Sequence, residues 1–159
     1  MTLRTLDRAS SLLRHIATLG PIGHIPFAPG TFGTAAGFLI LLLARPDRLP
    51  LMAITLLIFV VGIISSHFAE IHFKKKDPGQ VVIDELAGYF ASMMFLDMNV
   101  VNLILAFLLF RCFDILKPPP IRSAETLFKG GLGVMMDDLL AGVYAYISVV
   151  LCTKILNLF

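Results

Sequence analysis

Charged side chains are scarce in this sequence of 159 residues. Asp, Glu, Lys and Arg make up 15% of it, apolar residues make up 57%, and the mean hydropathy is +0.86. Soluble domains contain about a quarter charged residues. The composition therefore favours a protein that is solvated largely by lipid, and the net charge of +2 argues against a nucleic-acid-binding surface.

The sequence also lacks a disulfide pattern, an internal repeat and a continuous leader. Cys112 and Cys152 stand alone in apolar runs, which predicts small packed side chains rather than a disulfide scaffold. The N-terminal arginines are followed by several glycines and prolines between Gly20 and Gly30, which break any signal-peptide core. We expect residues 1–159 to form one domain, with its N-terminus in the cytoplasm.

What is present is a series of five apolar segments. Residues 49–69 and 134–158 are long enough to cross a bilayer as helices, whereas residues 31–44, 81–96 and 99–116 are shorter. At about 1.5 Å per residue, the shortest reaches roughly 21 Å, against a hydrocarbon core of about 30 Å. We predict an all-α, polytopic membrane protein with about five membrane-embedded or re-entrant helices.

The basic residues predict which side of this bundle faces the cytoplasm. If the five helices alternate in direction from a cytoplasmic N-terminus, only Arg45, Arg48 and Lys154 of the 13 Lys and Arg residues lie outside. This is the bias of the positive-inside rule. The same topology places six acids at the inner side, namely Asp84, Glu85, Asp114, Glu125, Asp137 and Asp138.

Two pairs of adjacent acids stand at the start of predicted helices. Asp84-Glu85 and Asp137-Asp138 are each followed directly by apolar residues, where a carboxylate is costly and commonly functional. One such acid is explained by the helix dipole, but two adjacent acids, twice, are explained poorly. Converging carboxylates suit Mg²⁺, which prefers oxygen ligands.

Basic and glycine-rich motifs accompany the acids. Arg111, Asp114 and Lys117 recur every three residues, so they share one helix face; alone they could be a structural ion-pair ladder, but beside four more acids they favour a mixed metal and phosphate site. The glycines directly before the last predicted helix, Gly130, Gly131 and Gly133, could present backbone N–H groups to a phosphate. In the turn at residues 28–34, Thr31 or Thr34 is placed to cap a helix.

Four blocks of the sequence resemble the phosphatidylglycerophosphatase A family. They are PFAPGTFGT (26–34), IDELAG (83–88), FRCFDILKPPPIR (110–122) and GGLGVMMDDLLAG (130–142), in the family's order and approximate spacing. The run of three prolines from Pro118 to Pro120 departs modestly, because the family commonly has a different residue between two flanking prolines. We expect this change to affect loop stiffness more than chemistry.

The resemblance implies a Mg²⁺-dependent phosphatase that converts phosphatidylglycerophosphate to phosphatidylglycerol and phosphate at the cytoplasmic face of a bacterial inner membrane. It implies that the catalytic and metal-binding acids are Asp84, Glu85, Asp114, Asp137 and Asp138. The basic partners are Lys117, as a catalytic residue, and Arg122. The further substrate-binding candidates are Thr31, Arg111, Gly130, Gly131 and Gly133. One carboxylate without metal would deprotonate the attacking water, and an aspartyl-phosphate intermediate is the alternative.

Three other interpretations stay open at this stage. A lipid phosphotransferase would also gather carboxylates and Mg²⁺ at a membrane surface. A cation or proton transporter would use intramembrane acids, although transport sites tend to lie near the bilayer midplane. A soluble helical bundle with an unusually apolar surface would explain the short segments. The sequence does not predict an oligomeric state.

Overall fold

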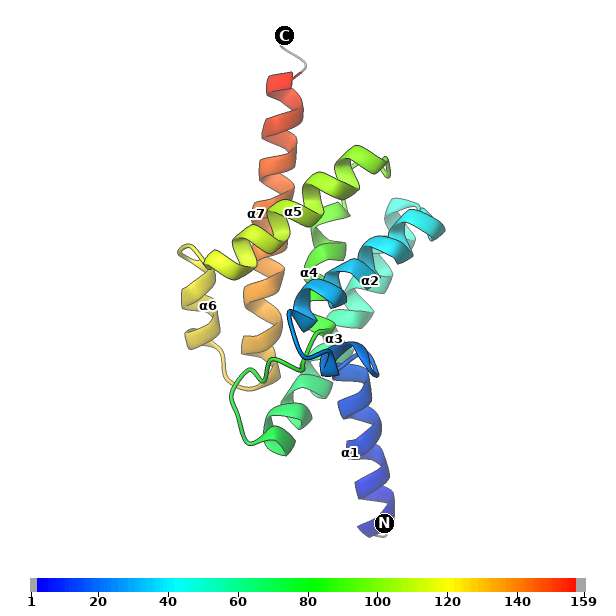
Figure 1. Cartoon of the computed structure of the whole chain (residues 1–159), viewed down its shortest axis with the longest axis vertical. Coiled ribbons are helices and arrows are strands. Elements are labelled where there is room, and N and C mark those ends of the chain that lie inside the picture. The colour runs from blue at the N-terminus through cyan, green and yellow to red at the C-terminus, as the bar shows by residue number, and fades with distance from the viewer. Residues whose placement is uncertain (1–2, 157–159) are drawn as a thin grey trace.

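The chain folds into a bundle of helices (Figure 1). The computed structural model describes the backbone of residues 3–156 and the side chains of residues 8–124 and 127–155. The described part has seven α-helices, one short 3₁₀ helix and no strand. In chain order the elements are α1 (Leu3–Ala17), η1 (Ile22–His24), α2 (Pro29–Ala44), α3 (Arg48–Phe73), α4 (Ile83–Met93), α5 (Val100–Leu116), α6 (Ile121–Leu127) and α7 (Gly131–Leu156).

The all-α prediction is confirmed, with seven α-helices in the described residues where five had been predicted. The five predicted segments correspond to α2, α3, α4, α5 and α7, whereas α1 and α6 were not predicted. Two helices, α3 and α7, are long and apolar enough to cross a bilayer. At 11 residues, α4 is about 16 Å long, roughly half of a hydrocarbon core.

Local signals explain where α5 begins. The side chain of Asn99 caps the helix by accepting a hydrogen bond from the backbone N–H of Asn102, at 2.8 Å. The side-chain amide of Asn102 in turn donates to the carbonyl of Asp97, at 3.1 Å. These bonds satisfy groups that a helix start leaves unpaired, so the polar residues between α4 and α5 define where α5 begins.

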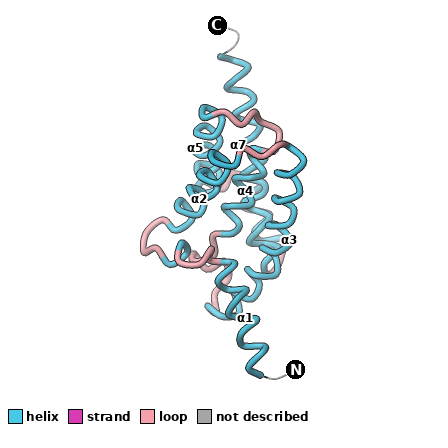
Figure 2. The backbone as a smooth tube through the Cα atoms, turned by 90° about the vertical axis from the view of Figure 1, so that its right-hand side faces the viewer, coloured by secondary structure: helices cyan, strands magenta, loops and turns pink. Residues whose placement is uncertain are grey.

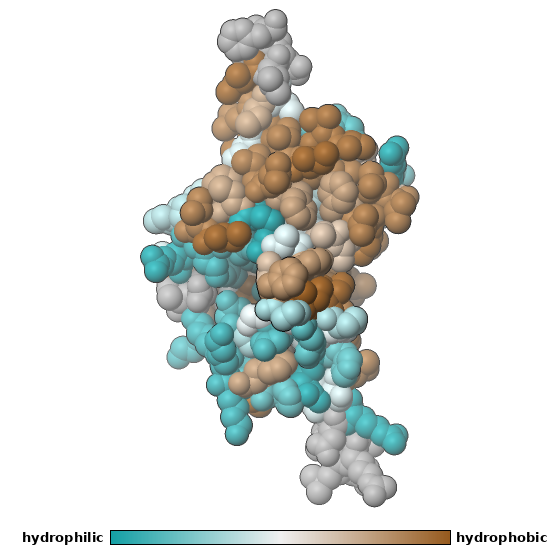
Figure 3. All heavy atoms as spheres, in the orientation of Figure 1, coloured by the Kyte–Doolittle hydropathy of each residue, from teal (hydrophilic) through white to brown (hydrophobic). Residues whose placement is uncertain are grey.

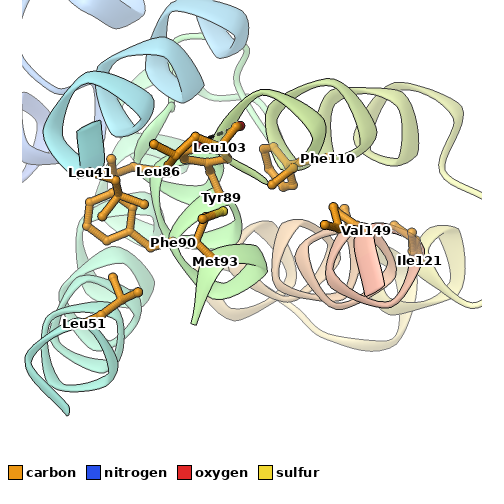
Figure 4. Packing of buried hydrophobic residues seen from close by; sticks show 13 residues of the cluster. Leu41, Leu51, Leu86, Tyr89, Phe90, Met93, Leu103, Phe110, Ile121 and Val149 are labelled. Atoms are coloured by element: carbon orange, nitrogen blue, oxygen red, sulfur yellow. Dashed lines mark hydrogen bonds between the residues drawn. The ribbon is translucent and has the colours of Figure 1, made fainter. Parts of the chain in front are cut away.

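The short helix α4 lies at the centre of the bundle, and its side chains carry much of the core (Figure 4). Tyr89 and Met93 are fully buried, and the Tyr89 hydroxyl donates to the carbonyl of Leu103 on α5, at 2.9 Å. Helix α4 packs against α2, α3, α5 and α7. A buried helix with partners on all sides has little freedom to shift, so α4 fixes the position of the acids in its first turn.

The surface divides into an apolar and a hydrophilic region (Figure 3). Apolar side chains cover the part toward the C-terminal end of α7, and hydrophilic side chains gather toward α1. Helix α1 protrudes from the end of the bundle opposite to the C-terminus of α7 (Figures 1 and 2). Exposed apolar residues include Leu43 on α2, Leu57 on α3, Val101 on α5 and Leu151 on α7. An exposed apolar surface of this extent indicates a membrane or protein partner.

Candidate active site

Three carboxylates from two helices converge inside the bundle. Asp84 and Glu85 lie in the first turn of α4, and Asp138 lies in the second turn of α7. One oxygen from each lies within 4.8 Å of the others. Acids separated by more than 50 positions therefore share one site, as the alternating topology predicted.

Two glycines permit this approach of α4 and α7. A β-carbon on Gly88 would lie 2.5 Å from the carbonyl oxygen of Asp138, and a β-carbon on Gly142 would overlap the carbonyl of Gly88. Glycine at both positions lets the two backbones come closer than side chains would allow. The helix crossing thus brings Asp138 next to the first turn of α4.

Asp84 and Asp138 are buried, Glu85 is half-buried, and all three acids are incompletely paired. Asp84 is 6% exposed and Asp138 is 3% exposed. Oδ1 of Asp84, Oε2 of Glu85 and Oδ2 of Asp138 are buried oxygens without a hydrogen-bond partner. Buried polar groups are nearly always paired, so three unpaired oxygens directed into one site indicate room for a ligand.

Electrostatics at the start of α4 favour a cationic ligand. Burial raises the pKa of Asp84 well above its ordinary value, and the charges of neighbouring acids raise it further. Burial also raises the pKa of Glu85, to about 7. A bound cation would stabilise the ionised form of both groups. The possible metal ligands in the cluster are all carboxylate oxygens, so the site fits a hard divalent ion such as Mg²⁺.

Two basic side chains hold the other predicted acids at the border of this cluster. Arg111 forms an ion pair with Asp114 on the same helix, and its Nη1 lies 3.7 Å from Oε1 of Glu85. Lys117 Nζ lies 2.6 Å from Oδ2 of Asp137. The five acids predicted as metal ligands therefore divide into a three-carboxylate cluster and two acids paired with basic residues.

The start of α2 lies directly beside these groups. A β-carbon on Gly30 would overlap the Glu85 carboxylate and lie 3.1 Å from Nη1 of Arg111. Thr31 is half-buried in the same turn. The prediction that Thr31 or Thr34 caps this helix is wrong, because α2 begins earlier, at Pro29. The Thr34 hydroxyl instead donates to the carbonyl of Gly30, at 2.9 Å.

The glycines at residues 130–133 occupy a different environment from the one predicted. Gly130 directly precedes α7, as predicted, whereas Gly131 and Gly133 lie in its first turn, since α7 begins at Gly131. A β-carbon on Gly131 would overlap the carbonyl of Ile63 on α3, and the N–H of Gly133 donates to the carbonyl of Gly130, at 2.8 Å. These contacts are with α3 and within the turn itself. Arg122 has an exposed side chain on α6.

Asp77 belongs to the electrostatic environment of the site, although it was not predicted. Its charge is among those that raise the pKa of Asp84, after burial and the effects of Glu85. Its backbone N–H donates to Oε1 of Glu70, at 3.0 Å, which fixes the turn before α4. The Asp-Pro dipeptide at residues 77–78, just before the acidic block, was the available sequence signal.

A buried carboxylate cluster with Arg and Lys at its border, inside an all-helical bundle with an apolar exterior, is typical of the functional site of a membrane-associated protein. The sequence model of the family Phosphatidylglycerophosphatase A matches residues 15–153. The chain belongs to this family and is a phosphatase.

Curated relatives agree with this assignment. A protein of Bacteroides thetaiotaomicron, with the provisional name phosphatidylinositol-3-phosphatase, is 38% identical over 91% of this chain and 95% of its own. Proteins named phosphatidylglycerophosphatase A from Haemophilus influenzae and Escherichia coli K12 are each 35% identical. The first alignment covers 86% of this chain and 91% of the relative, and the second covers 88% and 86%. No solved structure matches the chain.

Proposed function

We propose that this enzyme hydrolyses phosphatidylglycerophosphate to phosphatidylglycerol and phosphate, with Mg²⁺ as its cofactor. The observation that carries the proposal is the cluster of Asp84, Glu85 and Asp138, whose oxygens lie within 4.8 Å of one another. The family and two named relatives support the substrate. The unpaired carboxylate oxygens support the cofactor.

These three carboxylates would hold the ion, with Asp114 and Asp137 close by. When bound, Mg²⁺ supplies positive charge that offsets the charge of the phosphate and of the attacking oxygen. Asp84 and Asp138 are buried and so are screened from bulk water. Their interaction with a cation is therefore stronger than it would be in water.

The basic residues would bind and orient the phosphate. The Nε of Arg111 is buried and has no hydrogen-bond partner, so it is available to donate to a phosphate oxygen. Lys117 can turn from Asp137 toward the same anion, because its stem is flexible. Holding the phosphate in line with a water molecule supplies much of the rate gain in phosphoryl transfer. A carboxylate of the cluster would accept the proton of that water.

The membrane setting is part of the proposal. Helices α3 and α7 would cross the inner membrane. The shorter α2 and α5 would be partly embedded in it, with their exposed apolar residues in contact with lipid. The distribution of Lys and Arg supports a cytoplasmic location for the acids. With the acids at this surface, the site lies at the depth of the lipid phosphate.

The test is phosphate release from phosphatidylglycerophosphate in detergent micelles, with and without Mg²⁺. We expect the native protein to release phosphate only with Mg²⁺, and Asp138→Asn to lose the activity by at least about a hundredfold, as expected for a group that stabilises developing charge. Asp97→Asn, at an exposed acid in the α4–α5 turn, is the matched control and should keep it.

The substrate choice is tested in the same assay with phosphatidylinositol-3-phosphate, the lipid in the name of the Bacteroides relative. Faster hydrolysis of that lipid would overturn the proposed substrate while leaving the phosphatase chemistry intact. Equal activity of Asp138→Asn and native protein would overturn the proposed site.

A further inference from the structure

An apolar groove runs between α2 and α5 on the outside of the bundle. It has a volume of about 360 Å³, which lies within the range of small-molecule sites, roughly 300–1,000 Å³. Its lining residues are Ala35, Phe38 and Leu39 from α2, and Ile104, Phe107 and Leu108 from α5. All six side chains are apolar, so the groove suits a hydrocarbon ligand rather than a polar one.

The groove has a rigid floor and an open side. The rings of Phe38 and Phe107 pack edge to face, with centroids 6.2 Å apart, and Phe107 packs in the same way on the buried Tyr89. Leu39 and Leu108 are both more than half exposed. Figure 3 shows an apolar surface over α2 and α5, so the groove would open toward lipid in a membrane.

The same two helices lead from the groove to the carboxylate site. Arg111 follows Leu108 by three residues on α5, which places it on the same face one turn along the helix. On α2, Gly30 lies about one and a half turns before Ala35, and its position is next to Arg111 and Glu85. The groove and the charged site are therefore consecutive parts of one path between α2 and α5.

We infer that this groove binds an acyl chain of the phospholipid substrate while its phosphate lies at Arg111 and the carboxylates, an inference that rests on the proposed function. The occupant has an apolar chain joined to an anionic head, and the path offers apolar walls followed by a buried guanidinium with an unpaired N–H. The chain positions the phosphate by restricting how the lipid lies in the site.

A second apolar depression, between α3, α4 and α7, serves as the structural comparison. It has a volume of about 520 Å³ and includes Ala53, Leu56 and Phe59 of α3 and Leu139 of α7. Neither lining includes a basic side chain. The groove at α2 and α5 differs because its two helices continue to Gly30 and Arg111, which lie beside the Glu85 carboxylate.

The experiment fills each groove with the same substitution. Ala35→Phe places a ring in the α2–α5 groove, and Ala53→Phe places one in the comparison groove. For each variant, kcat/KM is measured on dioleoyl phosphatidylglycerophosphate in micelles and on the water-soluble head group without acyl chains, glycerophosphoglycerophosphate. We expect Ala35→Phe to lose about tenfold on the lipid and to match the native protein on the head group, because only chain positioning is lost. Ala53→Phe should match the native protein on both.

Labelling provides a readout that is independent of turnover. A phosphatidylglycerophosphate with a diazirine at mid-chain should crosslink to α2 and α5 in the native protein, and less so in Ala35→Phe. Equal kcat/KM ratios for lipid over head group in native protein and Ala35→Phe, or crosslinks concentrated on α3 and α7, would overturn the groove while leaving the phosphatase intact. Failure of native protein to hydrolyse either compound would overturn the proposed function and the groove with it.

Discussion

Lys117 and Asp137 join the end of α5 to the second turn of α7 through an ion pair of 2.6 Å. Lys117 is the C-cap of α5, and Asp137 is 3% exposed. The pair thus fixes the border of the site from two helices that the chain connects through α6. Removal of this ion pair should lower both the stability and the catalytic activity.

A double-mutant cycle measures this coupling. Lys117→Met and Asp137→Asn should each lower the free energy of unfolding in detergent, since each leaves a charged partner in a mostly buried place. The double variant should lose less than the sum of the two, by about 1–3 kcal/mol. Lys154→Met, an exposed lysine near the end of α7, should change stability by no more than about 0.5 kcal/mol. Strict additivity would show that the pair contributes nothing.

The crossing of α4 and α7 should not tolerate a methyl group. Gly142→Ala is expected to push the helices apart, because its β-carbon would overlap the carbonyl of Gly88. Overpacking of this kind destabilises by about 1–3 kcal/mol, and the shift should reduce kcat by moving Asp138 away from Asp84. Gly79→Ala is the control, as no atom lies within 4 Å of its β-carbon position. Native kcat in Gly142→Ala would contradict the close crossing.

Mg²⁺ should stabilise the folded enzyme through the three-carboxylate cluster. A ligand at about 100 times its Kd stabilises by about 2.7 kcal/mol, which should raise the thermal unfolding midpoint by several degrees for a chain of this size. Asp84→Asn removes one proposed ligand and should abolish the shift, whereas Asp97→Asn should keep it. A shift of equal size in Asp84→Asn would place the ion elsewhere.

The two thiols should be dispensable for catalysis. Cys112 and Cys152 are unpaired and exposed, so the prediction that they pack as small buried side chains was wrong. Cys112 is adjacent in sequence to Arg111, yet the proposed chemistry uses carboxylates, Mg²⁺ and basic side chains. The double variant Cys112→Ser/Cys152→Ser should hydrolyse phosphatidylglycerophosphate within about twofold of the native rate, as surface substitutions usually have small effects. A much slower variant would indicate a thiol nucleophile.

The cysteine-free protein allows the orientation to be measured. In that background, Lys75→Cys should react with a membrane-impermeant maleimide from the cytoplasmic side, and Arg45→Cys should react only from the opposite side. Both native side chains are exposed. Arg45 lies just before the start of α3 and Lys75 just after its end, so the two positions report on opposite ends of this helix. Reaction of both from one side would rule out a membrane-spanning α3.

The sequence predicted that the acids converge but not how close together their carboxylates lie. Alternating helices were enough to bring Asp84, Glu85 and Asp138 to one end, because direction and side follow from segment lengths and charge. Their separation depends on how closely α4 and α7 cross, which is decided by Gly88 and Gly142. A glycine in an apolar run does not reveal which backbone it will face, so this contact was not predictable from the residues alone.

Other parts of the site were predicted in type but not in place. Arg111 and Asp114 form the ion pair that the ladder alternative allowed. Lys117, the left-handed C-cap of α5, pairs instead with Asp137 on α7. The glycine-rich motif at residues 130–133 was interpreted as a phosphate-binding loop, and the structure places Gly131 against α3. A short glycine cluster is compatible both with a close helix contact and with a bound anion, so the sequence does not distinguish the two. Helix α1 was missed since the predictions followed long apolar runs, whereas it mixes apolar and basic residues.

The acids of the carboxylate cluster lie on two helices that are far apart in the chain, α4 and α7, and this has a consequence for the order of synthesis. Helix α4 is synthesised before α7, and at 11 residues with two adjacent acids it is a poor candidate for stable insertion on its own. The cluster therefore assembles only after α7 has been synthesised and has packed on α4. A chain that stops short of residue 138 contains Asp84 and Glu85 but lacks the third acid of the cluster.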